Sequence, residues 1–547
     1  MLSLRMNRHP ATGVVSVMLL LAVACGDGGA TDDAGAAPAD RPRTDGSGDA
    51  GATDALLSTD AEDEADVDDV APAPEDGSAT SDGSGETEGS ADAGPVEVVV
   101  ETLIVEDGAG ALPSQFEAAV ASPAAGPSVV YPESGTVMPW NVTAPLIQWE
   151  GAAGGAYRLR LTMGAAAVDV YTTDWKWQAS EAEWEAIVRR AGGSTMQLTV
   201  SRLGAGIETG AAAELTVVQG SVDGAIYYWA PDQSAIVRLP IGATEPEPFI
   251  TGTAFSCAGC HALSPDGSRV AYTRGGGTPI GPMGVRSTDA AGTQIQAESL
   301  SGYYPSFGPD NVSLAVARGG NIVIINTDTG DDVITLPKPE GTSATYPAYS
   351  PVEHTVVFSA GAPGVGGALE ALGVSQAGLV RVSRTGTTWG APEWLLENGD
   401  ALRPGENLFY PAISPDGNWV AFNRADSAAG AGSSPPGSEL WMVSANPSAP
   451  WGALEMARAQ GPAGTTNSWP KWAPATGSDR MWIAFTSNRT YGRIATGGSQ
   501  IWIASVSTTD AFLGEDPSDA AYWMPHQSLA TSNHVAYWAP YRKGDDE

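Results

Sequence analysis

The residues with the most reactive side chains form one short run, Cys257-Ala-Gly-Cys260-His261. The chain has three cysteines, and two of them lie in this run. Two thiols three positions apart can close a local disulfide or react together with one electrophilic partner, and the neighbouring imidazole can bind a metal ion. This run is therefore the first place to look for chemistry.

The spacing of these residues is that of c-type haem attachment, C-x-x-C-H. Each thiol adds to one vinyl group of the porphyrin, and the adjacent imidazole reaches the iron from one side. We therefore expect a covalent haem c on Cys257 and Cys260, with His261 as an iron ligand. The motif departs from the cytochrome c family in one respect, because no helical cytochrome fold surrounds it.

Two other interpretations of the run remain open. Exported cysteines oxidise, so Cys257 and Cys260 can form a plain structural disulfide, with His261 incidental. A zinc site is the third option and the weakest, because two sulfurs and one histidine leave the tetrahedral shell incomplete. The haem interpretation is favoured over both.

The segment that contains the motif belongs to a series of internal repeats. Cys260-His-Ala-Leu-Ser-Pro-Asp266 is in frame with four later copies, and a short β-rich run follows each of them. The repeated prolines are 44, 42, 64 and 59 residues apart. A period of this size, built from strand–turn–strand units, is typical of a β-propeller. The four later copies begin at Tyr304-Pro, Tyr346-Pro, Tyr410-Pro and Trp469-Pro.

The repeat count closes at six. Val535-Ala-Tyr-Trp-Ala-Pro540 begins a sixth copy with only seven residues left after it, so its outer strands must come from elsewhere. The hairpin Ala225–Leu239 can supply them, and the ring then closes without a free sheet edge. The Pro-Asp-Gly turns and the strands that follow them resemble the TolB-like six-bladed propeller family over roughly residues 221–547. This resemblance implies a fold more strongly than a function.

Ring closure suggests a second iron ligand. His534 stands at the start of the innermost strand of the sixth repeat, and the ring makes that blade a neighbour of the first blade, which carries His261. We therefore expect His261 and His534 on one face, as the two axial ligands of a haem. His526 is the next candidate, followed by Met524.

The N-terminus has the features of an export signal. Arg5 and Arg8 precede an apolar stretch of about ten residues, too short for a spanning helix and suited to a signal peptide. The stretch ends in Leu-Ala-Val-Ala-Cys25, which resembles the lipobox of bacterial lipoproteins. That resemblance implies a lipid on Cys25 after removal of residues 1–24, and anchoring in the cell envelope, with the outer membrane as the expected membrane. An ordinary cleaved signal remains the alternative.

Charge and aromatic content then divide the rest of the chain. The net charge is −37, so no basic surface is available to bind nucleic acid. Residues 25–125 hold one aromatic side chain and are rich in Asp, Ala and Gly, which predicts an acidic, disordered tether. Val96–Val105 is the one strand-like run within it and is a candidate to dock onto the folded region. Residues 126–220 alternate short apolar runs with turns, which predicts a small immunoglobulin- or fibronectin-like β-sandwich, and Ser180-Glu-Ala-Glu183 predicts the start of one helix.

Two functions fit these features. The first is an all-β, membrane-anchored propeller whose haem c takes part in electron transfer or redox sensing with a protein partner. The alternative is a non-catalytic propeller that binds protein or glycan partners, with Cys257 and Cys260 as a disulfide. None of the common catalytic motifs occurs, and we expect no catalytic residues.

Overall fold

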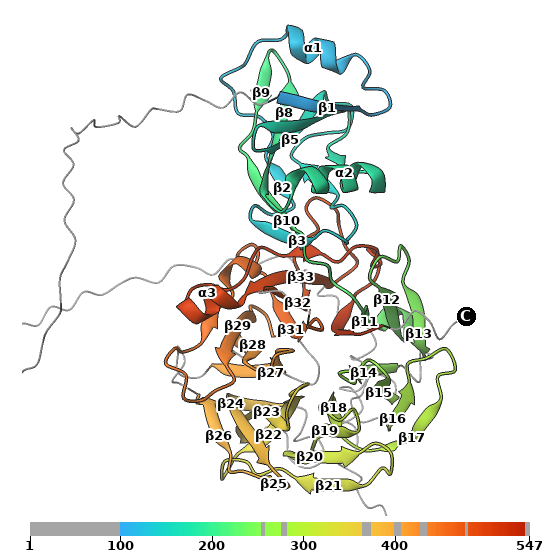
Figure 1. Cartoon of the computed structure of the whole chain (residues 1–547), viewed down its shortest axis with the longest axis vertical. Coiled ribbons are helices and arrows are strands. Elements are labelled where there is room, and N and C mark those ends of the chain that lie inside the picture. Colours follow the sequence, from blue (N-terminus) through green and yellow to red (C-terminus); the bar gives the residue numbers. More distant parts are fainter. Residues whose placement is uncertain are drawn as a thin grey trace, which may run out of the picture. The chain divides into compact units, whose positions relative to one another are not determined.

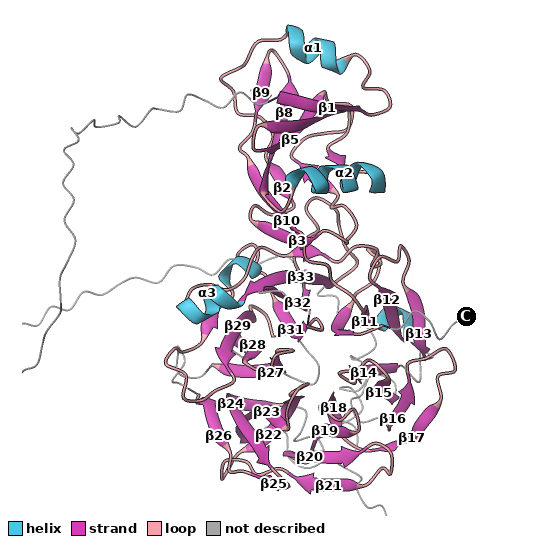
Figure 2. Cartoon of the chain, viewed as in Figure 1, coloured by secondary structure: helices cyan, strands magenta, loops and turns pink. Residues whose placement is uncertain are grey.

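The structure is a computed structural model that describes residues 99–252, 258–274, 282–363, 373–398, 406–426, 435–475 and 480–541. Strands are the predominant regular structure in this part of the chain (Figure 2). The expected signal peptide, the lipidation site Cys25, most of the acidic tether and Cys257 lie outside the described residues. No helix in the described ranges is long and apolar enough to cross a bilayer.

The first folded region is a β-sandwich with an immunoglobulin-like strand order. One sheet has the order β1-β6-β5-β8-β10-β3, with β9 beside β8, and the other has the order β2-β4-β7. In the immunoglobulin nomenclature, β6-β5-β8-β10 correspond to strands C′-C-F-G, and β2-β4-β7 correspond to strands A-B-E. The predicted immunoglobulin- or fibronectin-like sandwich is therefore confirmed. The larger sheet contains β1 (Val99–Val105), β3 (Thr136–Pro139), β5 (Tyr157–Met163), β6 (Ala166–Thr172), β8 (Thr195–Leu203), β9 (Ile207–Thr209) and β10 (Ala213–Val218), and the smaller contains β2 (Val129–Tyr131), β4 (Ile147–Trp149) and β7 (Lys176–Trp177).

The predicted helix of this region is α2 (Glu181–Ala191), and its ends have the expected physical causes. Ser180 and Glu183 form a reciprocal capping box at the N-terminus, and Gly192 ends the helix in the left-handed conformation with φ 59°. Trp184, Ile187 and Val188 lie on its buried face and join the core of the sandwich.

The tether ends earlier than the sequence predicted. Strand β1 adds to the sandwich in parallel with β6, and the short helix α1 (Leu112–Ala118) buries Leu112 and Phe116. The prediction of disorder up to residue 125 was therefore wrong for α1, whereas the strand-like run Val96–Val105 does contain a strand, β1, that docks onto the sandwich. Phe116 packs edge-on against Tyr171, and this contact outweighs the polar composition around it.

The second region is a ring of six β-sheets, the blades of a propeller (Figure 1). In the first five blades the strands follow chain order within each sheet. The first blade contains β14 (Ala258–Leu263), β15 (Arg269–Arg274), β16 (Met283–Ser287) and β17 (Gln294–Leu300), and the second contains β18 (Tyr303–Phe307), β19 (Ser313–Arg318), β20 (Asn321–Asn326) and β21 (Asp332–Thr335). The third contains β22 (Ser343–Tyr349), β23 (Thr355–Pro363), β24 (Val374–Thr385), β25 (Thr388–Trp389) and β26 (Glu393–Leu396), and the fourth contains β27 (Asn407–Ile413), β28 (Trp419–Ala425), β29 (Glu439–Ser444) and β30 (Leu454–Glu455). The fifth contains β31 (Asn467–Trp472), β32 (Arg480–Ser487), β33 (Gln500–Ser507) and β34 (Tyr522–Trp523), with α3 (Thr508–Leu513) between β33 and β34.

The sixth blade joins the two ends of the propeller sequence. Its order is β13-β12-β11-β35, with β11 (Ala225–Ala230), β12 (Ala235–Pro240) and β13 (Glu247–Thr251) paired to the last strand, β35 (His534–Ala539). Tyr227 pairs with Tyr537 across this junction. The predicted closure through the hairpin Ala225–Leu239 is therefore confirmed.

The repeated aspartates stabilise the turns between strands through hydrogen bonds. The Asp266 carboxylate accepts hydrogen bonds from the backbone N–H of Ser268 and from the hydroxyl of Ser264. Asp416 accepts in the same way from Asn418 and Ser414. These bonds hold the two Pro-Asp-Gly turns, a position at which Asp is favoured because it bonds to nearby backbone N–H groups.

Candidate functional site

The innermost strand of every blade carries a bulge at the same position of the repeat. There, two residues of the inner strand oppose one residue of the next strand, and the first of the two has a positive φ. Positive φ is uncommon for residues other than glycine, and a bulge re-aims the side chain that it carries. The six residues are Cys260 (φ 30°), Tyr304 (53°), Tyr346 (51°), Tyr410 (52°), Trp469 (56°) and Val535 (48°).

Four of these six side chains are aromatic and pack against one another. The rings of Tyr410 and Trp469 stack with centroids 3.5 Å apart, and the Tyr346 ring lies 4.6 Å from both Tyr304 and Tyr410. Burial raises the pKa of all three tyrosines above the usual value, so their hydroxyls remain protonated. The four rings form a neutral cluster, which we call the aromatic plug.

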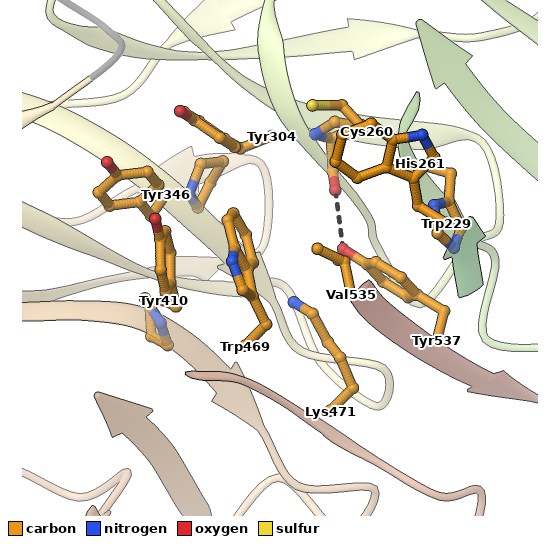
Figure 3. Close-up of a pocket in the computed structure, with 13 residues that line it drawn as sticks. Trp229, Cys260, His261, Tyr304, Tyr346, Tyr410, Trp469, Lys471, Val535 and Tyr537 are labelled. Atoms are coloured by element: carbon orange, nitrogen blue, oxygen red, sulfur yellow. Dashed lines mark hydrogen bonds between the residues drawn. The ribbon is translucent and has the colours of Figure 1, made fainter. Parts of the chain in front are cut away.

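The other two bulge residues are small, and they leave a cavity beside the aromatic plug. Cys260 and Val535 belong to neighbouring blades, and both line this cavity of about 60 Å³, which we call the axial cavity. In Figure 3 the plug lies on one side, Cys260, His261 and Trp229 lie on the other, and the amino group of Lys471 points toward the space between them.

His261 is the second residue of its bulge and is 2% exposed. Its Nε2 lies 3.2 Å from the carbonyl oxygen of Tyr227, which can only accept, so Nε2 carries the proton and donates. Nδ1 is then a buried acceptor, and it has no hydrogen-bond partner among the described residues. Burial lowers the pKa of His261 to about 4, with the carbonyl of Tyr227 opposing the shift and Lys471 adding to it.

Lys471 brings a positive charge to the same cavity. Burial alone lowers the pKa of its ammonium to about 8. Its Nζ lies 4.6 Å from the centre of the Tyr537 ring, and it makes no ion pair or hydrogen bond with any described residue. The hydroxyl of Tyr537 donates to the carbonyl of Pro305 at 3.3 Å, so this ring is held across the cavity wall (Figure 3).

Comparisons with known proteins found similarity to solved structures alone. No protein-family model matches the sequence, and no curated protein matches it. Its structure is similar to TolB from Acinetobacter baumannii, with a TM-score of 0.39 and 15% identity over 66% of this chain and 86% of that chain. A putative TolB from Agrobacterium tumefaciens (TM-score 0.33, 12% identity, 59% and 100% covered) and dihydro-heme d1 dehydrogenase NirN in complex with DHE (0.30, 12%, 53% and 52%) are also similar. The assignment of a six-bladed propeller rests on the strand pairing of this chain itself.

The structure brings two of the predicted site residues together. Cys260 and His261 both line the axial cavity, while Cys257 lies outside the described residues. Within the described ranges no group of three or more His, Cys, Asp or Glu side chains is arranged to hold a metal ion. The zinc interpretation therefore gains no third ligand there.

His534 is not equivalent to His261 in the repeat. His534 pairs with Trp229 ahead of its bulge, whereas His261 follows the positive-φ residue and corresponds to Ala536. His534 is not among the residues that line the axial cavity in the described structure, and its Nε2 is 2.6 Å from the hydroxyl of Ser532. We expected His261 and His534 at nearly equivalent positions of the repeat. They lie two positions apart in it, because His534 precedes the positive-φ residue of its bulge and His261 follows the positive-φ residue of its own.

The other two candidates for a second ligand also lie apart from the cavity lining. The Nε2 of His526 is 2.8 Å from the hydroxyl of Thr143, and Met524 is 2% exposed within the hydrophobic core that β11 and β35 share with the sandwich.

Sequence reasoning missed Lys471, although the repeat contains a signal for it. The third residue of the repeated line is small in four blades (Ala262, Ser306, Ala348 and Ala412) and large in the last two, where Lys471 and Tyr537 occupy it. These two exceptions contact each other at the cavity wall. A break in a repeat at matched positions of neighbouring blades is a sign of a site.

The donor atoms of the site suit a haem, but the axial cavity is too small to hold one. A thiol and an imidazole with one unpartnered nitrogen lie side by side, as attachment and ligation require. The axial cavity, however, has less than half of the roughly 150 Å³ that encloses a benzene ring, and a porphyrin is far larger. A haem on Cys260 therefore does not lie within this cavity.

Proposed function

We propose that this chain is an envelope protein whose propeller carries a covalent haem c for electron transfer or redox sensing. The observation that carries the proposal is the C-x-x-C-H run together with the position of its last two residues. Cys260 and His261 line one cavity, and the Nδ1 atom of His261 is a buried acceptor without a described partner. A buried acceptor left unpaired is costly, and a ligand would relieve that cost.

In this proposal the residues have separate roles. The thiols of Cys257 and Cys260 hold the porphyrin through thioether bonds, and His261 orients it through the iron. The haem supplies a one-electron couple when bound. Because His261 is 2% exposed and its Nε2 donates to Tyr227, the proposal requires the imidazole to be uncovered during attachment.

The location is part of the same proposal. The export signal and a lipid on Cys25 would hold the chain in the bacterial envelope, outside the cytoplasm, which is where bacteria attach haem covalently. A redox partner would meet the propeller in the envelope. The acidic residues 26–95, which carry 20 acidic and two basic side chains, would act as the tether between anchor and folded region.

One observation favours the alternative function, a non-catalytic propeller that binds protein or glycan partners. The close packing of His261 and the small size of the axial cavity are what a structural histidine would show, with Cys257 and Cys260 closed as a disulfide. Such a disulfide would fix the start of the first blade without any cofactor.

An absorbance spectrum separates the two functions. The mature chain is produced in a bacterial host that attaches haem c, purified, denatured and extracted with acidified organic solvent. A Soret band that stays with the polypeptide supports the haem proposal, and the double variant Cys257→Ala/Cys260→Ala should lose it. A colourless protein whose two cysteines resist alkylation until they are reduced would overturn it in favour of the disulfide.

The same preparation tests the second iron ligand. If His534 ligates the iron, the variant His534→Ala converts a low-spin spectrum to a high-spin one while the haem stays attached. His354→Ala serves as the matched control, because the Nδ1 of His354 lies 2.8 Å from the hydroxyl of Tyr349 and the residue is not a candidate ligand. An unchanged spectrum in His534→Ala removes this residue as a ligand, as its hydrogen bond to Ser532 would lead one to expect.

A further inference from the structure

We propose that the axial cavity binds a small monovalent oxyanion, such as a short carboxylate, through the ammonium of Lys471. This site is formed by residues of the fifth and sixth blades as well as the first, and it does not require haem. Its main donors, Lys471 and the indole N–H of Trp229, have no role in the haem proposal.

The first step of the argument is charge. Lys471 has no carboxylate partner in the described part of the chain, and no Asp or Glu is among the residues that line the cavity. Burial of an ammonium without a counter-ion is unfavourable. The ring of Tyr537 offsets this cost only in part, since a cation–π contact of this kind contributes about 0.5–2 kcal/mol.

The second step is the set of hydrogen-bonding groups that the fold leaves unused. Two lining residues carry buried polar atoms without a described partner, the indole N–H of Trp229 and the Nδ1 of His261. The indole can donate to an anionic oxygen, as the ammonium can, and Nδ1 can accept from a ligand hydroxyl or a water. Because His261 is only 2% exposed, bulk solvent cannot supply a hydrogen-bond partner for Nδ1.

The third step is size. A volume of about 60 Å³ admits roughly two or three non-hydrogen atoms, on the scale in which the six carbons of benzene need about 150 Å³. The flat walls formed by Tyr304, Tyr410 and Trp469 favour a planar ligand. Formate, with three non-hydrogen atoms in one plane, meets these conditions, and larger carboxylates do not.

The test uses the small number of lysines in the chain, which has four. The mature chain is labelled with ¹³C at the lysine Cε, and sodium formate is titrated while its Cε signals are followed. A matched series replaces formate with gluconate, which has the same charge and is too large to enter. We expect the Lys471 signal to move saturably with formate, with a Kd on the order of 1 mM given the limited affinity available to so few atoms, and to stay in place with gluconate.

Two variants remove the site in different ways. Lys471→Met deletes the charge, and Val535→Phe fills the cavity while keeping Lys471, at a bulge position where four other blades already hold an aromatic residue. Formate binding, measured by calorimetry, should weaken at least tenfold in each variant and remain unchanged in the control Lys176→Met, which lies in the sandwich. Equal responses to formate and gluconate, no response of Lys471 to either, or undiminished formate binding in the folded Val535→Phe protein would each overturn the proposal.

Discussion

Lys471 is both a candidate binding group and a residue whose burial destabilises the folded chain. Its pKa is about 8 in the folded chain and 10.5 in an exposed lysine, so the folded state releases the proton at a lower pH than the unfolded state does. Between these two values the unfolded chain binds more protons, and stability therefore rises with pH. The groups that face Lys471 do not reverse this trend, because His261 is neutral and the plug tyrosines are protonated over the range.

This gives a prediction for the pH dependence of stability. Between pH 7 and pH 9 the free energy of unfolding of the wild-type chain should rise by about 1 kcal/mol relative to Lys471→Met, because the charged form is progressively lost from the folded state. Urea unfolding at both pH values measures the difference. Parallel behaviour of the two proteins would show that Lys471 is solvated in the folded chain.

His261 gives the same sign as Lys471 at a lower pH, because the pKa of each group is lower in the folded chain than in the unfolded chain. Its folded pKa of about 4 is below the ordinary 6.5, so the unfolded chain takes up the proton first as the pH falls. Stability is fully present above pH 6.5 and declines between pH 6.5 and 4. The variant His261→Gln should lose this part of the decline in a cofactor-free preparation, as measured by urea unfolding at pH 7 and pH 5; an identical slope in both proteins would contradict the buried, neutral histidine.

At the scale of elements, the sequence predicted strands well and the bulges within them poorly. The Tyr-Pro repeats located five inner strands, because alternating apolar residues and Pro-Asp turns have a local cause. The positions of His261 and His534 depend on a bulge, and the one-residue offset that a bulge introduces has no clear signature in a strand pattern.

The aromatic plug leads to a prediction at this scale. Trp469 is 8% exposed and stacks on Tyr410, so Trp469→Ala should lower the free energy of unfolding by about 3–5 kcal/mol through lost packing and the space left behind. Trp469→Tyr introduces the residue found at the same bulge in three other blades and should cost less than about 1.5 kcal/mol. Denaturant unfolding of both variants is the measurement. A loss below 1 kcal/mol in the alanine variant would mean that the plug does not stabilise the ring.

At the scale of the whole molecule, the propeller depends on a junction between residues more than 300 positions apart. Trp538 donates its indole N–H to the carbonyl of Asp223 at 2.8 Å, and Ser532 donates its backbone N–H to Asp232 at 2.9 Å. Without β35, strand β11 would present an unpaired inner edge, and the first and fifth blades would lose the neighbour between them. An open ring of this kind exposes both apolar surface and strand edges, which favours association between chains.

Removal of β35 tests whether the ring unfolds as one unit. A chain that ends at Asn533 should lose its cooperative thermal transition and associate, whereas a chain that ends at Tyr541 keeps β35 and serves as the matched control. The expected loss of stability is larger than the contribution of the contacts within β35 alone, because the two neighbouring blades lose packing at the same time. Calorimetry and light scattering on both chains measure this. A monomeric 1–533 chain that melts cooperatively near the temperature of the control would show that the five remaining blades are stable without closure, and that β35 contributes only its own contacts.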